Sequence, residues 1–256
     1  MASRRNTPDR PRLTARSVIA STRLGVDPPS LPTRSLVASA ELLGVSAGTA
    51  RVAMSRMVAA GELEPDGDGY RLAGHLLARQ ARQAQSRSGE TRPWGGTWRS
   101  ALVPGEARTA ADRADLRRTM SSLRFGELRD GVWLRPDNLA ADLPPTVVGI
   151  AGPLDDGADP VVLARSLWDL DGWADGASSL LEELAPLQVR LDAGDGGALA
   201  AAFVTAAAVL RHLQADPLLP PDLLPATWPG AKLRAGQEAF DRRFKAVLRT
   251  VLLGGS

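Results

Sequence analysis

The chain has 256 residues, of which 44% are hydrophobic and 23% charged, as in ordinary folded proteins with room for two or three small domains. It contains no cysteine, which excludes disulfides, cysteine-ligated zinc fingers and thiol nucleophiles. By our reading no apolar run approaches the roughly eighteen residues of a membrane-spanning helix, and the start lacks the apolar core of a signal peptide. We therefore expect a cytoplasmic protein with no membrane partner.

The net charge is only +2, but it is unevenly distributed. Residues 1–60 contain nine arginines and three acidic residues, whereas residues 61–256 contain 22 basic and 26 acidic residues. A local basic surplus is what counterion-release binding to nucleic acid requires, and a mildly acidic remainder stays away from phosphates. The charge distribution thus favours a nucleic-acid contact near the amino terminus.

The first thirty residues predict a tail, a short helix and a loop. Residues 1–12 are polar and contain two prolines, which predicts a disordered basic tail. Thr14 is suited to cap a helix that runs to about Arg23. The three prolines within Gly25–Pro32 then predict a loop.

The next stretch predicts a helix-turn-helix. A helix from Leu36 closes at Gly44, because glycine readily adopts the left-handed conformation that ends helices. Ser46 restarts the chain as an N-cap, and Ala47–Ala60 follows with good helix formers and no proline. We interpret this second helix as a recognition helix.

The two sides of that second helix differ in character. Apolar residues at three- and four-residue steps form one stripe: Ala50, Ala53, Met54, Met57 and Val58. Small, hydroxyl and arginine residues occupy the other side, together with the cap: Ser46, Gly48, Thr49, Arg51, Val52, Ser55 and Arg56. Small residues let a helix enter the major groove, and arginines bind guanine edges or phosphates. These residues predict a face that binds double-stranded DNA.

A hairpin wing follows the recognition helix. Glu62–Glu64 and Tyr70–Leu72 are strand-like, and Pro65–Gly69 between them has the composition of a tight turn. Since phosphates repel the two aspartates of the turn, we expect Arg71 to make the DNA contact of the wing. The same order of elements also occurs in small structural domains, so the polar face is what favours DNA binding.

The middle of the chain predicts a connector and a small sheet. His75 to about Ser88 is a connector helix, and a homodimer is expected because two operator half-sites are needed for tight, selective binding. A ferredoxin-like α/β arrangement then follows, in which a second helix is the weakest element. Its predicted elements are a strand at Thr97–Val103, a helix at Ala107–Leu123 with Ala110, Ala114, Leu116, Met120 and Leu123 inward, and strands at Phe125–Leu128, Val132–Arg135 and Thr146–Ala151.

The last hundred residues predict helices. These are Pro160–Trp168, Asp171 to about Leu187, Gly196–Leu213 and Gly230–Leu253. The five prolines of Asp216–Pro229 forbid regular structure there, but its leucines and Trp228 favour an ordered loop. The expected fold class is α+β. The expected domains are a disordered tail (1–12), a winged helix-turn-helix (13–73), a connector and linker (74–93), a ferredoxin-like central domain (94–155) and a helical C-terminal domain (156–256).

Motifs for catalysis have little support. The two histidines, His75 and His212, are far apart and in no metal-spaced cluster, and no nucleophile-elbow or phosphate-loop motif occurs. We interpret the glycine-rich Gly194–Gly197 as a turn between helices. The carboxylates around Trp168 and Trp173, Asp169, Asp171 and Asp175, are compatible with acid-base or metal chemistry but also with helix capping, which we favour. We expect no enzyme, no metal and no cofactor.

With these segments in place, the chain resembles the PaaX-type transcriptional repressors of phenylacetic-acid catabolism. The resemblance runs from about Arg16 to Leu248 and includes ARVAMSRM at Ala50–Met57 and the segment Leu116–Leu139. The most specific motif is HLQADPLLPPDLLPATWPG at His212–Gly230. The resemblance implies a repressor that leaves its operator when an aryl-coenzyme A thioester, typically phenylacetyl-CoA, binds.

The resemblance also implies a central domain like the ferredoxin-like CRISPR-associated nucleases, which keep an aspartate at the end of the first strand. Here that end is Ala101–Pro104 and contains no acid, so we expect no nuclease. The segment around Trp94 departs from the tyrosine- and arginine-containing family pattern. Arginines for phosphates and aromatic residues for the acyl group give the candidate effector residues from the matching segments: Arg124, Trp133, Arg135, Trp168 and Arg211.

Two other hypotheses remain open. An effector-independent activator or architectural DNA binder would bind its operator regardless of any CoA ester. An acyl-CoA-handling enzyme with an inert helix-turn-helix would turn over a thioester, and the chain offers no evident nucleophile, base or metal cluster for that reaction.

Overall fold

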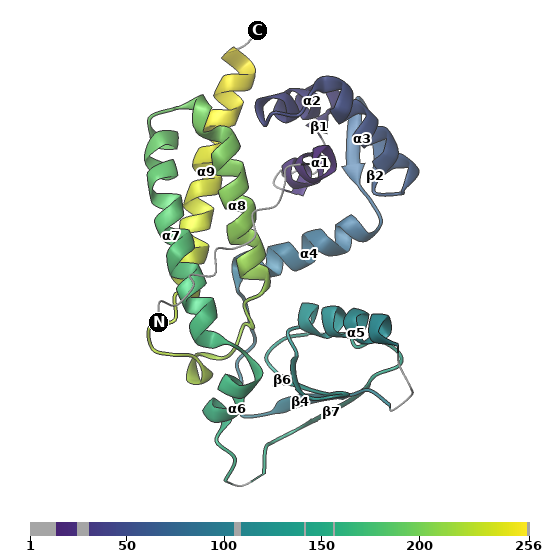
Figure 1. Cartoon of the computed structure of the whole chain (residues 1–256), viewed down its shortest axis with the longest axis vertical. Coiled ribbons are helices and arrows are strands. Elements are labelled where there is room, and N and C mark those ends of the chain that lie inside the picture. Colours follow the sequence, from purple (N-terminus) through teal and green to yellow (C-terminus); the bar gives the residue numbers. More distant parts are fainter. Residues whose placement is uncertain (1–13, 25–30, 105–108, 141, 156, 255–256) are drawn as a thin grey trace. The chain divides into compact units, whose positions relative to one another are not determined.

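The computed structural model describes residues 14–24, 31–104, 109–140, 142–155 and 157–254. The predicted tail at residues 1–12 lies outside the described residues. The fold is mixed α and β with two small sheets, which confirms the predicted class. By contacts the chain divides into two compact units (Figure 1). The first comprises residues 1–87, 178–211 and 232–256, and the second comprises residues 88–177 and 212–231.

The first unit begins with a winged helix, as the sequence predicts. Buried apolar side chains from its helices and wing share one core, in which Ile19, Leu36 and Met57 are almost inaccessible to solvent. Gly44 has φ of +82°, which is the left-handed turn expected between the two helices. Its elements are α1 (Ala15–Leu24), β1 (Leu31–Pro32), α2 (Thr33–Leu42), α3 (Ala47–Ala59), β2 (Leu63–Asp66), β3 (Gly69–Leu72) and α4 (His75–Ser88).

The predicted loop at Gly25–Pro32 lies outside the described residues up to Ser30 and is wrong at its last two residues. Leu31–Pro32 forms β1 and pairs antiparallel with β3, giving a three-stranded sheet in the order β1-β3-β2. Proline is tolerated there because β1 is an edge strand and one side of its backbone needs no partner. Thr33 extends the pairing by donating its backbone N–H to the Asp68 carbonyl at 3.1 Å.

The larger parts of helices α7 (Leu170–Asp192), α8 (Leu199–Gln214) and α9 (Gly230–Gly254) provide the rest of the first unit. Helix α7 continues five residues beyond the predicted end at Leu187 and tolerates Pro186 in its interior. A 3₁₀ turn at Gly196–Ala198 starts after Gly194, so the glycine-rich segment is the predicted inter-helix turn. Phe203 of α8 packs with Val18 and Ala40 of the winged helix.

The expectation that no apolar run reaches the length of a membrane-spanning helix is corrected. Among the described residues, the segment Gly196–Gln214 is long and apolar enough, by length and composition only, to cross a membrane. Its Leu199, Val209 and Leu213 are buried in the protein, as in the core helix of a folded domain.

The second unit is built on an antiparallel sheet in the order β5-β6-β4-β7. This is the strand order of a ferredoxin-like sheet, with α5 connecting β4 to β5. No helix occurs between β6 and β7 in the described residues, and α6 follows β7 instead. The elements are β4 (Trp98–Leu102), α5 (Ala110–Ser122), β5 (Gly126–Arg129), β6 (Val132–Pro136), β7 (Val148–Gly152) and α6 (Pro160–Leu167).

The two faces of this sheet have different coverings. Trp133 and Ala101 pack with Met120 of α5 on one face, whereas Leu134 and Trp98 pack with Ala164 of α6 on the other. Successive residues of a strand point to opposite faces, which explains how neighbouring β6 residues enter separate cores.

The inward face predicted for α5 is partly wrong. Ala110 and Ala114 are exposed, whereas Met120 is fully buried and Leu116 and Leu123 are partly buried. Alanine buries little apolar area, so the larger side chains determine how the helix faces the sheet. The predicted start at Ala107 lies outside the described residues, and a capping box from Thr109 begins the described helix.

The proline-rich segment is an ordered loop, as predicted. Leu218, Leu219 and Leu223 are buried, and the Asn138 side chain donates to the Leu218 carbonyl at 2.8 Å. The loop also carries a short 3₁₀ turn at Pro221–Leu223. Leu219 and Leu223 thereby pack in the same core as Ala164 of α6.

Candidate nucleic-acid interface

The two sides of α3 separate in the structure as their composition predicts. Ala50, Met54 and Met57 are buried, and Ala53 and Val58 are partly buried. Every residue of the predicted reading face is exposed: Ser46, Gly48, Thr49, Arg51, Val52, Ser55 and Arg56. Val52 is 51% exposed although it is apolar. We name these seven residues the reading face.

Local hydrogen bonds fix the start of the reading face. The Ser46 hydroxyl accepts from the Thr49 backbone N–H at 3.3 Å, as an N-cap does. The two hydroxyl oxygens lie 2.8 Å apart and share a hydrogen bond. The first turn of α3 is thus held by its own side chains and presents two hydroxyl groups to solvent.

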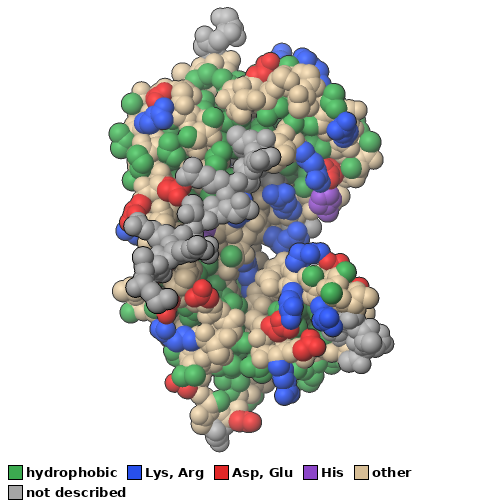
Figure 2. Space-filling model, viewed as in Figure 1, with side chains coloured by type: hydrophobic (Ala, Val, Ile, Leu, Met, Phe, Trp, Pro, Cys, Tyr) green, Lys and Arg blue, Asp and Glu red, His purple; other side chains and the backbone are tan. Residues whose placement is uncertain are grey.

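The two arginines of the reading face carry uncompensated charge. Within the described part of the chain, neither Arg51 nor Arg56 has a carboxylate at ion-pairing distance, and α3 itself contains no acidic residue. Figure 2 shows basic side chains over α3 and α4 on this side of the molecule, with few acidic ones. Exposed guanidinium groups of this kind are available to phosphates and base edges.

The wing is confirmed as a hairpin, but its arginine is engaged. Arg71 is exposed and forms an ion pair with Glu64, its direct cross-strand neighbour. The two aspartates of the tip, Asp66 and Asp68, are exposed. A phosphate contact by Arg71 therefore has to compete with Glu64.

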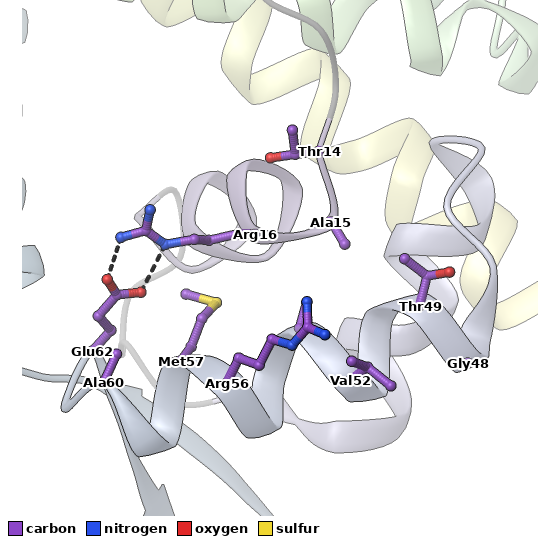
Figure 3. Close-up of a pocket in the computed structure, with 11 residues that line it drawn as sticks. Thr14, Ala15, Arg16, Gly48, Thr49, Val52, Arg56, Met57, Ala60 and Glu62 are labelled. Atoms are coloured by element: carbon purple, nitrogen blue, oxygen red, sulfur yellow. Dashed lines mark hydrogen bonds and ion pairs between the residues drawn. The ribbon is translucent and has the colours of Figure 1, made fainter.

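A groove of about 680 Å³ runs beside the reading face (Figure 3). Gly48, Thr49, Val52 and Arg56 of the reading face line it from α3. Thr14, Ala15 and Arg16 from the start of α1 also line it.

A buried carboxylate closes one end of this groove. The Arg16 guanidinium hydrogen-bonds both oxygens of Glu62, with Nε to Oε2 at 2.9 Å. Glu62 is only 4% exposed, and His75 Nε2 lies 3.6 Å from its Oε1. The hydrogen bond from Arg16 lowers the pKa of Glu62 and raises that of Arg16. Glu62 thus ties α1 and α4 to the base of the wing.

Sequence reasoning did not predict this cluster as part of the site. Arg16 and Glu62 are 46 residues apart, and the acid was interpreted as the start of a strand. The sequence offered one signal. Glu62 lies directly after the helix stop at Gly61 and directly before the apolar Leu63, which is where a buried strand commonly starts.

The candidate effector residues occupy different places. Trp133 and Arg135 are buried near Phe125, whose ring centroid lies 5.0 Å from the Arg135 guanidinium carbon. Arg124 is also buried and donates to the Gln214 carbonyl. Trp168 packs in the core on the opposite face of the sheet, and Arg211 is exposed in the other unit.

Of the three carboxylates near Trp168 and Trp173, Asp169 caps a helix, as favoured from the sequence. Asp169 Oδ1 accepts from the Gly172 backbone N–H at 2.9 Å in the first turn of α7. Asp171 is exposed and lies 3.5 Å from Arg165. Trp173 stacks on both His212 and Trp228, at centroid distances of 4.5 and 4.4 Å. Its indole N–H donates to the His212 carbonyl.

Comparison with protein families gives three consecutive matches. The families are described as PaaX-like protein (residues 14–76), PaaX protein central Cas2-like domain (residues 91–148) and PaaX-like protein C-terminal domain (residues 168–252). A comparison with curated proteins finds no match.

A solved structure shares the fold along nearly the whole chain. Uncharacterized protein Rv0674 from Mycobacterium tuberculosis is 41% identical, with a TM-score of 0.73. The similarity covers 93% of this chain and 98% of that one. Together with the three domain matches in their order, this similarity establishes that the chain belongs to the PaaX family of regulators.

Proposed function

We propose that this protein is a transcriptional repressor whose α3 helix enters the major groove of operator DNA. The observation that carries the proposal is the reading face, which is exposed along its whole length and bears two guanidinium groups without carboxylate partners among the described residues. A surface helix with only a structural role has no need for such a face, because small residues and unpaired arginines contribute little to stability.

The groove beside α3 supports the same proposal. Major-groove binding by a helix brings the neighbouring elements against the phosphate backbone. The start of α1 lies on that side, where the Thr14 hydroxyl offers a hydrogen-bond donor to a phosphate. The backbone amides of Thr14 and Ser17 already donate to each other's hydroxyl oxygens. The reading face would then select bases while α1 fixes the register on the duplex.

The test is binding of the full-length protein to DNA fragments selected by it from a random pool, measured by fluorescence anisotropy. Arg56→Ala should weaken binding to the selected site by about 1–3 kcal/mol if Arg56 reads a base. Arg129→Ala, an exposed arginine at the end of β5, is the matched control and should bind as the parent does. Failure to select any sequence, or equal binding by both variants, would contradict the proposal.

A homodimer is part of the proposal, and strand β7 supports it. This strand is at the edge of its sheet, and Val148 and Ile150 on one of its faces are 54% and 53% exposed. Antiparallel pairing of β7 with the same strand of a second copy would match each backbone group and cover both side chains. Ile150→Asp should therefore convert a dimer to a monomer in light scattering, whereas Val189→Asp, on exposed α7 surface, should not.

We further propose that the regulator acts in the cytoplasm on genes of aromatic-acid catabolism and is released by an aryl-CoA thioester such as phenylacetyl-CoA. Family membership supports this part, because PaaX-type proteins are regulators rather than enzymes. Adding phenylacetyl-CoA should lower operator affinity in the anisotropy assay while free CoA does not. Operator binding that is indifferent to every CoA ester tried would favour an effector-independent regulator.

A further inference from the structure

Three guanidinium groups of the second unit gather near one carboxylate, and two of them lie at ion-pairing distance from it. Arg92 Nη2 and Arg99 Nη1 lie 3.3 and 3.9 Å from Asp137 Oδ1. Arg135 is the direct cross-strand partner of Arg99, and both Arg92 and Arg135 donate to the Leu139 carbonyl. We name Arg92, Arg99 and Arg135 the arginine cluster.

The charges of this cluster do not balance. Three guanidinium groups around one carboxylate leave two positive charges without a partner among the described residues. Elsewhere among the described residues, ion pairs such as that of Arg117 with Glu127 join one arginine to one acid. Like charges on cross-strand neighbours destabilise a sheet, so this excess of positive charge indicates a role other than stabilising the fold.

Arg135 is the unusual member, because it is only 1% exposed. Its Nε has no hydrogen-bond acceptor among the described residues, and its guanidinium lies over the Phe125 ring, with Asp137 near but not at ion-pairing distance. Burial, followed by the charge of Arg99, lowers the pKa of Arg135 to about 10. A buried guanidinium without a counter-ion is costly, and a bound anion relieves that cost.

Arg92 and Arg99 provide access from solvent, since their side chains are 58% and 31% exposed. The planar fork of a guanidinium matches the oxygens of a phosphate, and two uncompensated charges match a phosphate dianion better than a single carboxylate. We propose that the arginine cluster binds the phosphate group of a small organic phosphate. Arg92 and Arg99 contact the phosphate, and Arg135 supplies positive charge from beneath.

A CoA thioester carries such phosphates, so the cluster is the place where the effector's phosphates would bind. That identification rests on the proposed function, whereas phosphate binding by the cluster does not. Of the predicted effector residues, this inference retains Arg135 and adds Arg92 and Arg99, which the sequence did not single out.

The experiment is calorimetric titration of the full-length protein with inorganic phosphate, adenosine 3′,5′-bisphosphate and CoA. Arg99→Gln should weaken binding of each probe about tenfold or more, because a charge-assisted contact is lost. Arg129→Gln removes the same charge from an exposed position on the same sheet and should change binding less than twofold. No binding by the parent protein, or equal binding by both variants, overturns the inference.

A second variant separates a binding role from a structural one. Arg135→Met keeps a long side chain in the buried position, and Arg92 still donates to the Leu139 carbonyl. We expect an unchanged or higher Tm without phosphate and loss of the Tm increase that phosphate gives the parent. A Tm lowered by many degrees, with the phosphate-dependent increase retained, would assign Arg135 a structural role only.

The DNA assay distinguishes the remaining outcomes. If Arg99→Gln lowers operator affinity in the absence of small ligands, the cluster contacts DNA phosphates and the inference is overturned. If the variant loses CoA binding and no CoA ester releases the parent from DNA, the effector proposal fails while the phosphate site stands. If phenylacetyl-CoA releases parent and variant equally, the site fails while the effector proposal stands.

Discussion

The ion pair between Arg16 and Glu62 should respond asymmetrically to removal of its two partners. Glu62 is 4% exposed, whereas the Arg16 side chain is 60% exposed. Arg16→Ala therefore leaves a shielded carboxylate at the wall of the groove without its partner, and Glu62→Gln leaves a guanidinium largely in water. The first change should cost much more than the second, because an unpaired buried charge loses its hydration without compensation.

The loss of stability caused by Arg16→Ala has an upper limit at pH 7. A carboxyl with an ordinary pKa of 4.5 can escape an unfavourable site at pH 7 by taking up a proton. That uptake costs about 3.4 kcal/mol at 1.36 kcal/mol per pH unit, so Arg16→Ala should cost no more than about 3 kcal/mol. Glu62→Gln loses one charge-assisted contact at a half-exposed partner and should cost about 1 kcal/mol.

The stability of the parent and that of Arg16→Ala should depend on pH in opposite directions. In the parent, the pKa of Glu62 is lowered, so its contribution is present above pH 4.5 and is lost as the pH falls through the folded-state pKa. In Arg16→Ala, burial without a partner should raise that pKa, so the penalty should shrink as the pH falls from 7 toward 4.5.

Hydrogen exchange of the wing measures these costs locally. The Glu62 amide donates to the Met57 carbonyl and the Ala73 amide donates to the Glu62 carbonyl, so both report opening at this point. Arg118→Ala breaks an exposed pair with Asp115 and should cost at most about 0.5 kcal/mol. Equal costs for Arg16→Ala and Glu62→Gln, or a penalty that does not change with pH, would refute the reasoning.

Single substitutions at four other positions give further tests. Gly74 has φ of +53°, and an added Cβ would lie 2.6 Å from the Gly61 carbonyl oxygen, so Gly74→Ala should cost about 2–3 kcal/mol in urea unfolding. Gly96→Ala has φ of +83° but open space and should cost about 1 kcal/mol. Burial lowers the pKa of His212, so thermal stability should fall as the pH drops below about 6.5, and His212→Gln should flatten that dependence. Val52→Ala should lower DNA affinity by about 1 kcal/mol with an unchanged salt dependence, because an apolar side chain contacts bases rather than phosphates. A reduced salt slope would contradict that role.

The elements that the sequence predicted well depend on local interactions. Ser46 accepts from Thr49 three residues later, and Gly44 adopts the turn that its lack of a side chain permits. The wing likewise pairs strands that are separated by only two residues, Gly67 and Asp68. Such features are determined by residues within a few positions, so a single sequence is enough to predict them.

The elements that were missed depend on partners far along the chain. Strand β1 exists because Leu31 meets Tyr70, and nothing in a proline-rich stretch indicates that pairing. Helix α5 exposes Ala110 and Ala114 because Met120, Leu116 and Leu123 make its contact with the sheet. Pro186 lies inside α7, where local propensity alone predicts an end or a kink.

The structure shows which of the basic charges in the sequence are paired with an acid, which composition alone does not show. The sequence places a surplus of arginines near the amino terminus, and that count treats every arginine alike. In the structure Arg16 is neutralised by Glu62 and Arg71 by Glu64. Arg51 and Arg56 keep their charge uncompensated among the described residues, and both lie on α3. Since attraction to DNA depends on charges that the protein itself has not neutralised, α3 rather than the wing should dominate the salt dependence of the proposed DNA binding.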